Sequence, residues 1–232
     1  MQCLPPLTSK QLKSPTNLLR DRNMDDADTP TLSEIFATSA TDGAVTGFTM
    51  AQLHKPDKPV LWIQDRLSRR EAGRPCLAGL PHPIEMLYVD VSKPIDALWA
   101  MEEGLRCTGL SAVIAEVWGD PAVLDFTATK RLALRAEARG LPAYLIRRSA
   151  TPNLSAARLR WRVSGLPSTH NQYDNRAPGK PLWSADLFRA RWRTPGQWVA
   201  SHDESGLQLA HDVVTQTPED AADHTDMLRQ TR

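Results

Sequence analysis

Apolar residues in this chain fall into short, nearly continuous runs. The longest run covers residues 110–119, contains β-branched residues and ends in a glycine. A run of this length is too short to cross a membrane, so it predicts a strand with both faces covered, as in a parallel sheet between helices. Its single charged residue, Glu116, lies near the carboxyl end of the strand. Open α/β sheets bind their ligands at that edge.

Two predicted helices flank this central strand. Apolar residues from 94 to 107 fall on one face at three- and four-residue steps, and Ser92 with Pro94 supplies a start signal. A second helix is predicted for 127–139, because Gly140 follows it as a stop signal. The alternation of strand and helix predicts right-handed crossovers and a mainly parallel sheet. The other predicted strands cover residues 32–36, 60–64, 85–91 and 143–146, and a short helix is expected at about 48–54.

The pattern changes in the last third of the chain. Charged and apolar residues alternate at 158–163 and at 188–193, and a turn at 194–196 precedes a third short run at 197–200. Alternation with period two predicts antiparallel strands at the sheet edge, each with one exposed face, joined by a long polar loop at 164–182. The expected fold class is therefore α/β, with a mainly parallel central sheet extended by antiparallel C-terminal strands. The expected organisation is a flexible N-terminal arm (1–30), one domain (31–212) and an acidic disordered tail (213–232).

Charge is distributed unevenly, although the formal net charge is only +1. Residues 130–193 carry 14 Lys and Arg against three Asp and Glu, whereas residues 203–232 carry seven acidic and two basic residues. A basic segment followed by an acidic tail favours an anionic partner for which the tail could compete. The alternative is a solvated surface whose charges balance over the whole molecule.

Cysteine and histidine usage points to a reducing compartment and to no metal site. The three cysteines lie far apart, and the six histidines are scattered without the spacing of metal ligands. The N-terminal residues lack the apolar core of a secretion signal, and no segment is long enough to span a bilayer. We therefore expect a cytoplasmic protein without metal or membrane contact.

The small-residue segment after the first predicted strand has the context of a phosphate-binding loop, either a degenerate one or a loop that never bound phosphate. In such loops the pattern G-x-x-x-x-G-K-[ST] places a lysine on the phosphates and a hydroxyl on the magnesium ion. With Gly43 as the second glycine, Ala44 and Val45 stand where the lysine and the hydroxyl belong, and a register shifted to Gly47 also lacks the lysine. The sequence therefore predicts no ATP turnover, no cofactor and no catalytic residue. Glu116 stands at the acidic position of such a site but would be a structural residue.

The two alternating segments concentrate arginine. Because alternate residues of a strand share a face, each segment would project three arginines on one side and anchor the other side with Trp161 or Trp192. Such a patch could bind nucleic-acid phosphates or an acidic protein segment, or it could be an ordinary solvated face. The predicted partner or DNA interface consists of Arg158, Arg160, Arg162, Arg189, Arg191 and Arg193.

Several segments between residues 32 and 203 resemble the ImuA family. The most distinctive are Asp-Ala-Leu-Trp-Ala-Met-Glu-Glu-Gly-Leu-Arg-Cys at 96–107 and Leu-Ser-Ala-Val-Ile-Ala-Glu-Val-Trp-Gly at 110–119. The resemblance extends to the helix at 132–140, to Ala-Ala-Arg-Leu-Arg-Trp-Arg-Val at 156–163 and to the late Arg-x-Arg…Pro-Gly-x-Trp segment. It implies a RecA-like three-layer core. It also implies an accessory role in the SOS response, in damage-induced mutagenesis, beside ImuB (an inactive Y-family polymerase) and a polymerase III α-like subunit. RecA and DNA are further candidate partners.

Three departures from RecA make ATP-driven filaments doubtful. The phosphate loop lacks its lysine, and the connections at 120–126 and 149–157 are too short for the two DNA-binding loops of RecA. The resemblance therefore favours a non-catalytic adaptor that helps to assemble an error-prone translesion synthesis complex. Two alternatives stay open at this point: an inhibitor of cell division resembling SulA, and a degenerate ATPase that still works.

Overall fold

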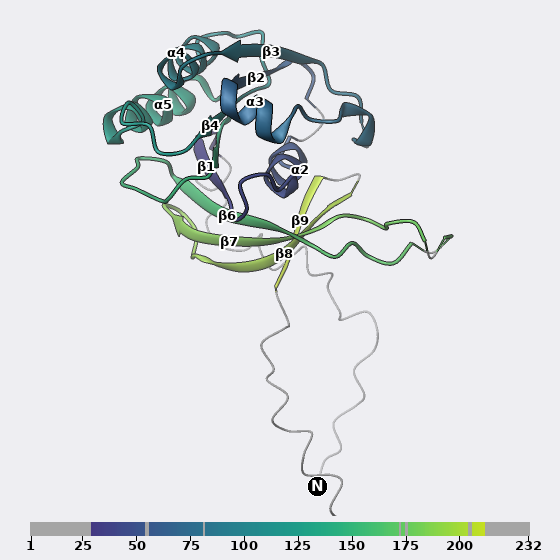
Figure 1. Ribbon diagram of the computed structural model, residues 1–232. Coiled ribbons are helices and arrows are strands. Elements are labelled where there is room, and N and C mark those ends of the chain that lie inside the picture. Colours follow the sequence, from purple (N-terminus) through teal and green to yellow (C-terminus); the bar gives the residue numbers. More distant parts are fainter. Residues whose placement is uncertain are drawn as a thin grey trace, which may run out of the picture.

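The computed structural model describes residues 29–53, 56–80, 82–171, 173–174, 176–203 and 206–211 of the chain. The predicted tail at 213–232 and nearly all of the predicted arm at 1–30 lie outside the described residues. The described residues form one nine-stranded sheet with helices on both of its faces (Figure 1).

The strand order of the sheet is β3-β2-β4-β5-β1-β6-β7-β8-β9. All neighbours from β3 to β6 pair in parallel, and the neighbours from β6 to β9 pair antiparallel. The predicted α/β, RecA-like fold class with antiparallel C-terminal strands is thus confirmed, although β6 itself is parallel to β1. The strands are β1 (Leu32–Ala37), β2 (Val60–Asp65), β3 (Met86–Val91), β4 (Ala112–Trp118), β5 (Ala143–Arg148), β6 (Leu159–Leu166), β7 (Leu182–Ala190), β8 (Gly196–Asp203) and β9 (Gly206–His211).

The helices make the outer layers of a three-layer arrangement. Helices α4 (Pro94–Gly104) and α5 (Phe126–Arg139) cover one face of the parallel strands, where their apolar sides join a core cluster. Helix α2 (Ala44–Ala51) covers the other face, and the sheet curls so that α2 also contacts β8 and β9 (Figure 1). A short helix, α3 (Arg66–Ala72), and a single 3-10 turn, η2 (Leu77–Gly79), lie between β2 and β3.

Local sequence accounts for most helix ends. The Asp125 carboxylate accepts a hydrogen bond from the Ala128 N–H at the start of α5, and Gly140 ends this helix in the left-handed conformation with φ 61°. Pro94 occupies the first turn of α4, with Lys93 rather than the predicted Ser92 at the N-cap position. Helix α4 ends at Gly104, three residues before the predicted end.

Other predicted boundaries were wrong. Helix α2 begins four residues before the predicted position at 48, because the Asp42 carboxylate accepts a hydrogen bond from the Ala44 N–H and starts the helix there. Helix α3 and strand β9 were not predicted. Strand β7 begins at residue 182, inside the predicted loop, and ends at residue 190, so the alternation at 191–193 does not continue the strand.

Aromatic side chains fill the core between α2 and the antiparallel strands. The Phe48 ring lies 5.3 Å from the Trp161 ring and 6.3 Å from the Trp183 ring, centroid to centroid. The Trp161 ring is in turn 5.9 Å from the Trp198 ring. Gly47 allows this packing, because a Cβ atom there would lie 2.8 Å from the Trp183 ring. Within the described part of the chain, no helix is long and apolar enough to cross a membrane.

Candidate functional site

The segment interpreted from the sequence as a degenerate phosphate loop connects β1 to α2 at the carboxyl edge of the parallel strands. Gly43 has an ordinary right-handed backbone with φ −70°. Ala44 and Val45, at the lysine and hydroxyl positions, are buried in the first turn of α2. Neither side chain can offer a charge or an oxygen to a ligand.

Arg148, at the end of β5, lies between this loop and the central strand. Its Nη1 donates hydrogen bonds to the carbonyl oxygens of Ala40 (3.1 Å) and Asp42 (2.9 Å). Its Nη2 donates to the Thr46 hydroxyl at 2.8 Å and to Glu116 Oε1 at 3.2 Å. The loop thus turns carbonyl oxygens toward a guanidinium, whereas a phosphate-binding loop turns N–H groups toward an anion.

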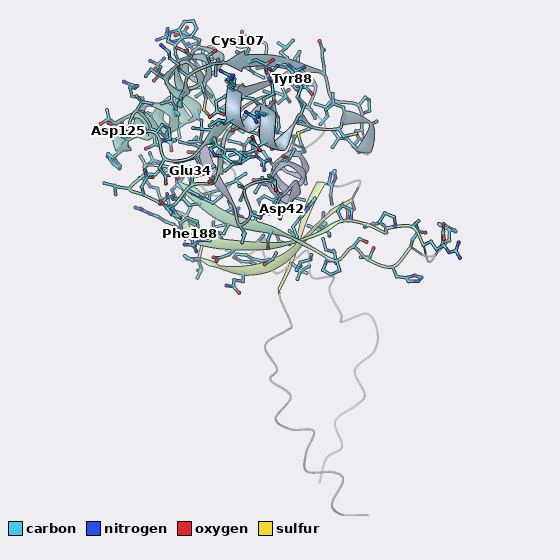
Figure 2. All side chains as sticks on the ribbon, in the orientation of Figure 1. Glu34, Asp42, Tyr88, Cys107, Asp125 and Phe188 are labelled. Atoms are coloured by element: carbon cyan, nitrogen blue, oxygen red, sulfur yellow. The ribbon has the colours of Figure 1, made fainter. Side chains whose placement is uncertain are left out.

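The N-terminus of α2 is also occupied from within the chain. Asp42 Oδ1 accepts a hydrogen bond of 2.8 Å from the Ala44 N–H, and its Oδ2 accepts one of 2.9 Å from the Gly165 N–H. Figure 2 labels Asp42 beside this helix. A carboxylate at the first turn takes the amide that a phosphate would use and repels any anion that approaches.

Glu116 on β4 is the buried acid of this arrangement, with 1% of its surface exposed. Its Oε1 pairs with Arg148, and its Oε2 accepts a hydrogen bond of 2.6 Å from the Gln64 amide. Burial raises the pKa of the Glu116 carboxyl above its usual range, and the charge of Arg148 and the Gln64 hydrogen bond act against that shift. Both carboxylate oxygens of Glu116 thus have partners within the chain, Arg148 and Gln64.

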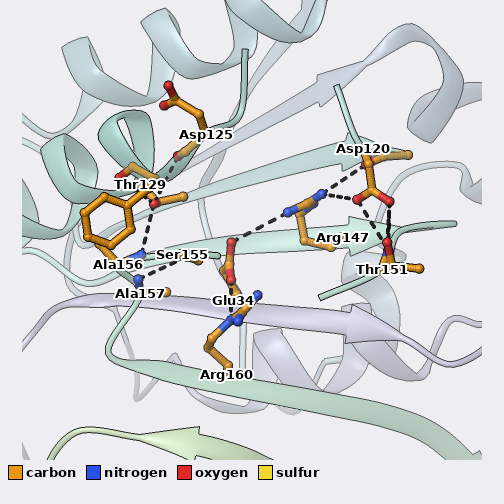
Figure 3. Close-up of polar contacts among 12 residues, drawn as sticks. Glu34, Asp120, Asp125, Thr129, Arg147, Thr151, Ser155, Ala156, Ala157 and Arg160 are labelled. Carbon is orange, nitrogen blue, oxygen red and sulfur yellow. Dashed lines mark hydrogen bonds and ion pairs between the residues drawn. The ribbon is translucent and has the colours of Figure 1, made fainter. Parts of the chain in front are cut away.

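A second buried network lies on the sheet face that α4 and α5 cover (Figure 3). Glu34 on β1 is fully buried between Arg160, at 2.7 Å, and Arg147, at 3.6 Å. Arg147 also pairs with Asp120 at 2.7 Å, and Asp120 accepts hydrogen bonds from the N–H and the hydroxyl of Thr151. This network joins β1, β5 and β6 to the connections that follow β4 and β5.

The predicted exposed face at 158–162 needs correction. Arg160 is 4% exposed, because it is the partner of buried Glu34 and its guanidinium lies over the rings of Phe36 and Phe188, 5.3 Å from each centroid. Arg158 forms a two-pronged ion pair with Glu137 on α5, at 2.6 and 3.1 Å. Arg162 is exposed and pairs with Asp186 at 3.0 Å. The three arginines of this strand therefore already have acidic partners.

The other three arginines are exposed. Arg189 is in β7, and Arg191 and Arg193 lie in the bend that follows it. No ion pair joins any of them to a residue that the structure describes. Trp192, expected to anchor the opposite face, is only half-buried, and the Arg191 guanidinium lies 5.5 Å from its ring centroid. A bulge at Arg160/Trp161 breaks the register of β6 with β7, so the six arginines do not form one continuous row.

A small hollow brings three arginines together where β7 ends and β6 begins. Its volume is about 300 Å³. It lies between the connection that precedes β6, the first residue of α5 and the bend after β7. Arg193 lies elsewhere, on a larger hollow at the amino edge of the parallel strands. The residues that line the small hollow are Phe126, Ser155, Ala156, Ala157, Arg158, Arg189, Ala190 and Arg191.

The sequence interpretation missed Glu34, Arg147 and Arg148. Glu34 is the only charge in the buried run at 32–36, and a buried carboxylate requires a cationic partner. The two arginines directly follow the apolar run at 143–146, at the sheet edge that also holds Glu116. Their position at this edge was the sequence signal that could have identified the two arginines. In the described residues, no three His, Cys, Asp or Glu side chains gather to hold a metal ion.

This chain is similar to a curated protein that is known from two strains of one species. Protein ImuA of Caulobacter vibrioides, in either strain, is 30% identical to this chain over 158 residues. The similarity covers 63% of this chain and 62% of the relative, so the chain spans less than two thirds of the length of these curated relatives. No family model matches the chain. The resemblance to the ImuA family that the sequence motifs indicate is confirmed by this similarity.

Proposed function

From the similarity to ImuA proteins, we propose that this chain is a non-catalytic, cytoplasmic adaptor with a RecA-like fold. It serves damage-induced mutagenesis by helping to assemble an error-prone translesion synthesis complex. Its partners in this proposal are an ImuB-like Y-family protein and a polymerase III α-like subunit, with RecA and DNA as further candidates. The proposed interface uses five arginines of the predicted set: Arg158, Arg162, Arg189, Arg191 and Arg193. The sixth, Arg160, is buried and pairs with Glu34.

One observation carries the non-catalytic part of this proposal. The guanidinium of Arg148 occupies the loop between β1 and α2 and pairs with Glu116, the acid that would hold a metal or activate water. A nucleotide would have to displace this cation, reverse the loop carbonyls and approach the Asp42 carboxylate. In this proposal, the chain has the scaffold of a nucleotide site without the groups that bind triphosphate. This favours an adaptor over the alternative of a degenerate ATPase.

The assembly role is tested by co-purification. A tagged copy of the chain is expressed in its own host after DNA damage, and the bound polymerase subunits are identified. We expect the ImuB-like protein and the polymerase III α-like subunit to co-purify, and we expect deletion of the gene to lower the frequency of damage-induced mutation. Recovery of neither subunit would overturn the proposal. Filamentous, undivided cells on strong expression would instead support the SulA-like inhibitor.

The non-catalytic role has its own test by titration calorimetry. ATP added to the purified protein, with and without Mg²⁺, should give no heat of binding, because the Arg148 cation and the Asp42 carboxylate occupy the loop. Micromolar affinity for ATP would overturn the non-catalytic part of the proposal and would restore the ATPase alternative.

A further inference from the structure

The hollow of about 300 Å³ beside the end of β7 is lined by both cationic and apolar residues. We call its three arginines (Arg158, Arg189 and Arg191) the rim and its three alanines (Ala156, Ala157 and Ala190) the floor. Its volume is at the lower end of the roughly 300–1,000 Å³ that is typical of ligand sites in proteins. A recess of this size accepts one side chain and the charged groups next to it.

The charge at the rim is only partly neutralised. Arg158 is held by Glu137, and Glu137 also accepts a hydrogen bond of 2.9 Å from the Thr31 hydroxyl. These contacts lower the pKa of the Glu137 carboxyl, which therefore stays ionised at neutral pH. Arg189 and Arg191 form no ion pair with a residue that the structure describes, although the charge of Arg191 also lowers the pKa of the Glu137 carboxyl. With Glu137 counted against the three arginines, the rim keeps a net charge of +2.

The bend after β7 is fixed in place, which limits how far the rim can rearrange. The Arg191 N–H donates a hydrogen bond of 2.9 Å to the Arg158 carbonyl oxygen, and the Arg191 guanidinium lies near the Trp192 ring. The wall is held as well, because the Ala156 N–H donates to the Thr129 hydroxyl at 3.0 Å. A preorganised arginine loses less entropy when it binds a carboxylate through its planar fork.

The surroundings favour a short acidic peptide over nucleic acid. A single-stranded nucleic acid is usually held by a continuous positive groove that follows its backbone. Here carboxylates interrupt the arginines along the chain: Glu137 pairs with Arg158, Asp186 pairs with Arg162, and Asp125 directly precedes Phe126. The apolar floor gives no advantage to a phosphate chain but suits an aliphatic side chain.

We propose that this hollow binds an acidic segment of a partner protein, in which an aliphatic side chain is flanked by carboxylates. The carboxylates pair with Arg189 and Arg191, and the aliphatic side chain covers Ala156, Ala157 and Ala190. Phe126, which is 42% exposed, adds apolar surface to the same hollow. This inference rests on the proposed adaptor function and specifies the chemistry of the partner segment.

The test measures fluorescence anisotropy with the full-length chain and three labelled probes. These are the peptide Glu-Glu-Leu-Glu-Glu, its Gln-Gln-Leu-Gln-Gln analogue and a single-stranded oligo-dT. We expect the acidic peptide to bind at low salt, the glutamine peptide to bind at least tenfold more weakly, and the R189A/R191A variant to lose about tenfold or more in affinity for the acidic peptide. The proposal would be overturned if oligo-dT bound more tightly than the acidic peptide and R189A/R191A weakened that binding. The hollow would then be a nucleic-acid site. Absence of any peptide binding would also overturn it.

A matched control removes two exposed charges elsewhere. Arg176 and Lys180 lie in the loop at the opposite end of the β6–β7 pair, so R176A/K180A changes the net charge equally but leaves the hollow intact. This variant should keep the wild-type affinity for the acidic peptide. An equal loss in both variants would show a non-specific charge effect and would contradict the proposal.

Co-purification separates failure of this inference from failure of the adaptor function. If wild type and R189A/R191A recover the ImuB-like protein equally, the adaptor function stands and the hollow is not its docking site. If the wild type recovers neither polymerase subunit, the adaptor function itself fails. The third outcome is that the wild type recovers the ImuB-like protein and R189A/R191A does not, although the variant has the melting temperature of the wild type. This outcome supports both the adaptor function and the hollow as the docking site.

Discussion

The loop that Arg148 fills and the hollow that Arg189 and Arg191 line use the same side chain in opposite ways. At the carboxyl edge, the guanidinium of Arg148 is buried and has four acceptors, all supplied by the fold. Beside the start of β6, Arg189 and Arg191 are exposed and form no ion pair with the described residues, and Arg191 acts on Glu137 only through its charge. In the first arrangement the guanidinium is used within the fold, and in the second the charge stays available at the surface.

The comparison shows that burial and partners decide whether an arginine stabilises the fold or can bind an external anion. A buried guanidinium is costly to desolvate and is stable only when a carboxylate and other acceptors surround it. An exposed arginine has no such requirement and retains its capacity for an external anion. Substitutions should therefore affect folding at the first site and binding at the second.

The largest expected effect is that of Arg148→Ala. The change leaves the Glu116 carboxylate buried without its cation and frees the carbonyl oxygens of Ala40 and Asp42. We expect a loss of about 3–5 kcal/mol in the free energy of unfolding, measured by urea denaturation at pH 7. A loss below about 1 kcal/mol would show that the contacts of Arg148 with Glu116 and the loop do not stabilise the fold.

The pH dependence of this variant provides a control. Burial already raises the pKa of Glu116, and removal of Arg148 raises it further. A carboxyl whose pKa is raised by folding is more readily protonated in the folded state, so its destabilising effect shrinks as the pH falls toward that pKa. The deficit of Arg148→Ala should therefore be smaller at pH 5 than at pH 7, and R148A/E116Q should recover part of it at both. A deficit independent of pH would indicate lost packing instead.

The next largest effect is expected for Arg160→Ala. The sequence had predicted an exposed side chain at this position. Its loss leaves Glu34 with Arg147 alone, at 3.6 Å, in a fully buried position. We expect a destabilisation of about 2–3 kcal/mol, less than for a buried acid left with no cation. Thermal melting and urea denaturation measure it. A change within about 0.5 kcal/mol would place Arg160 among the exposed arginines after all.

A smaller effect, present at neutral pH and lost in acid, is expected for Glu137→Gln. Hydrogen bonds from Arg158 and Thr31 hold the pKa of this carboxyl below its ordinary value of 4.5. Its contribution is therefore fully present above about pH 4.5 and is lost as the pH falls through the lower folded-state pKa. The variant should lose about 1 kcal/mol or less at pH 7 and should show a flatter decline of stability in acid. Parallel pH profiles of the two proteins would contradict this assignment.

The sequence predicted the fold well, because strand and helix signals were local. The apolar run that became β4 and the stop signal at Gly140 each depend on a few neighbouring residues. Helix α3 was missed because its seven residues, Arg-Leu-Ser-Arg-Arg-Glu-Ala, bury only Ser68 and show no apolar face. Strand β7 was misplaced because its pairing with β6 and β8, which no local pattern specifies, sets its start at residue 182.

The candidate site could be predicted only in part, because ion pairs join residues far apart in the chain. The loss of the phosphate-binding lysine could be seen directly in Gly43–Val45. The basic excess at 130–193 was misleading, because acids from earlier in the chain neutralise much of it. Glu34 pairs with Arg147 and Arg160, Glu102 with Arg131 and Arg135, and Glu116 with Arg148. Only the three-dimensional pairing shows which arginines remain available.

The smallest effect, and the sharpest test of the comparison, is that of Arg162→Ala. Arg162 lies two residues after Arg160 on the same strand, and strand alternation gives the two side chains the same face. Yet Arg162 has 48% of its side chain exposed, and within the described part of the chain its ion pair is with Asp186 near the surface. Because such pairs contribute little in water, we expect a loss of less than about 1 kcal/mol by urea denaturation, against the larger loss for Arg160→Ala. Its guanidinium also lies 4.2 Å from the Phe188 ring centroid, so part of that small loss should persist in high salt, which screens the ion pair. Equal losses for the two variants would mean that burial does not separate structural arginines from available ones in this sheet.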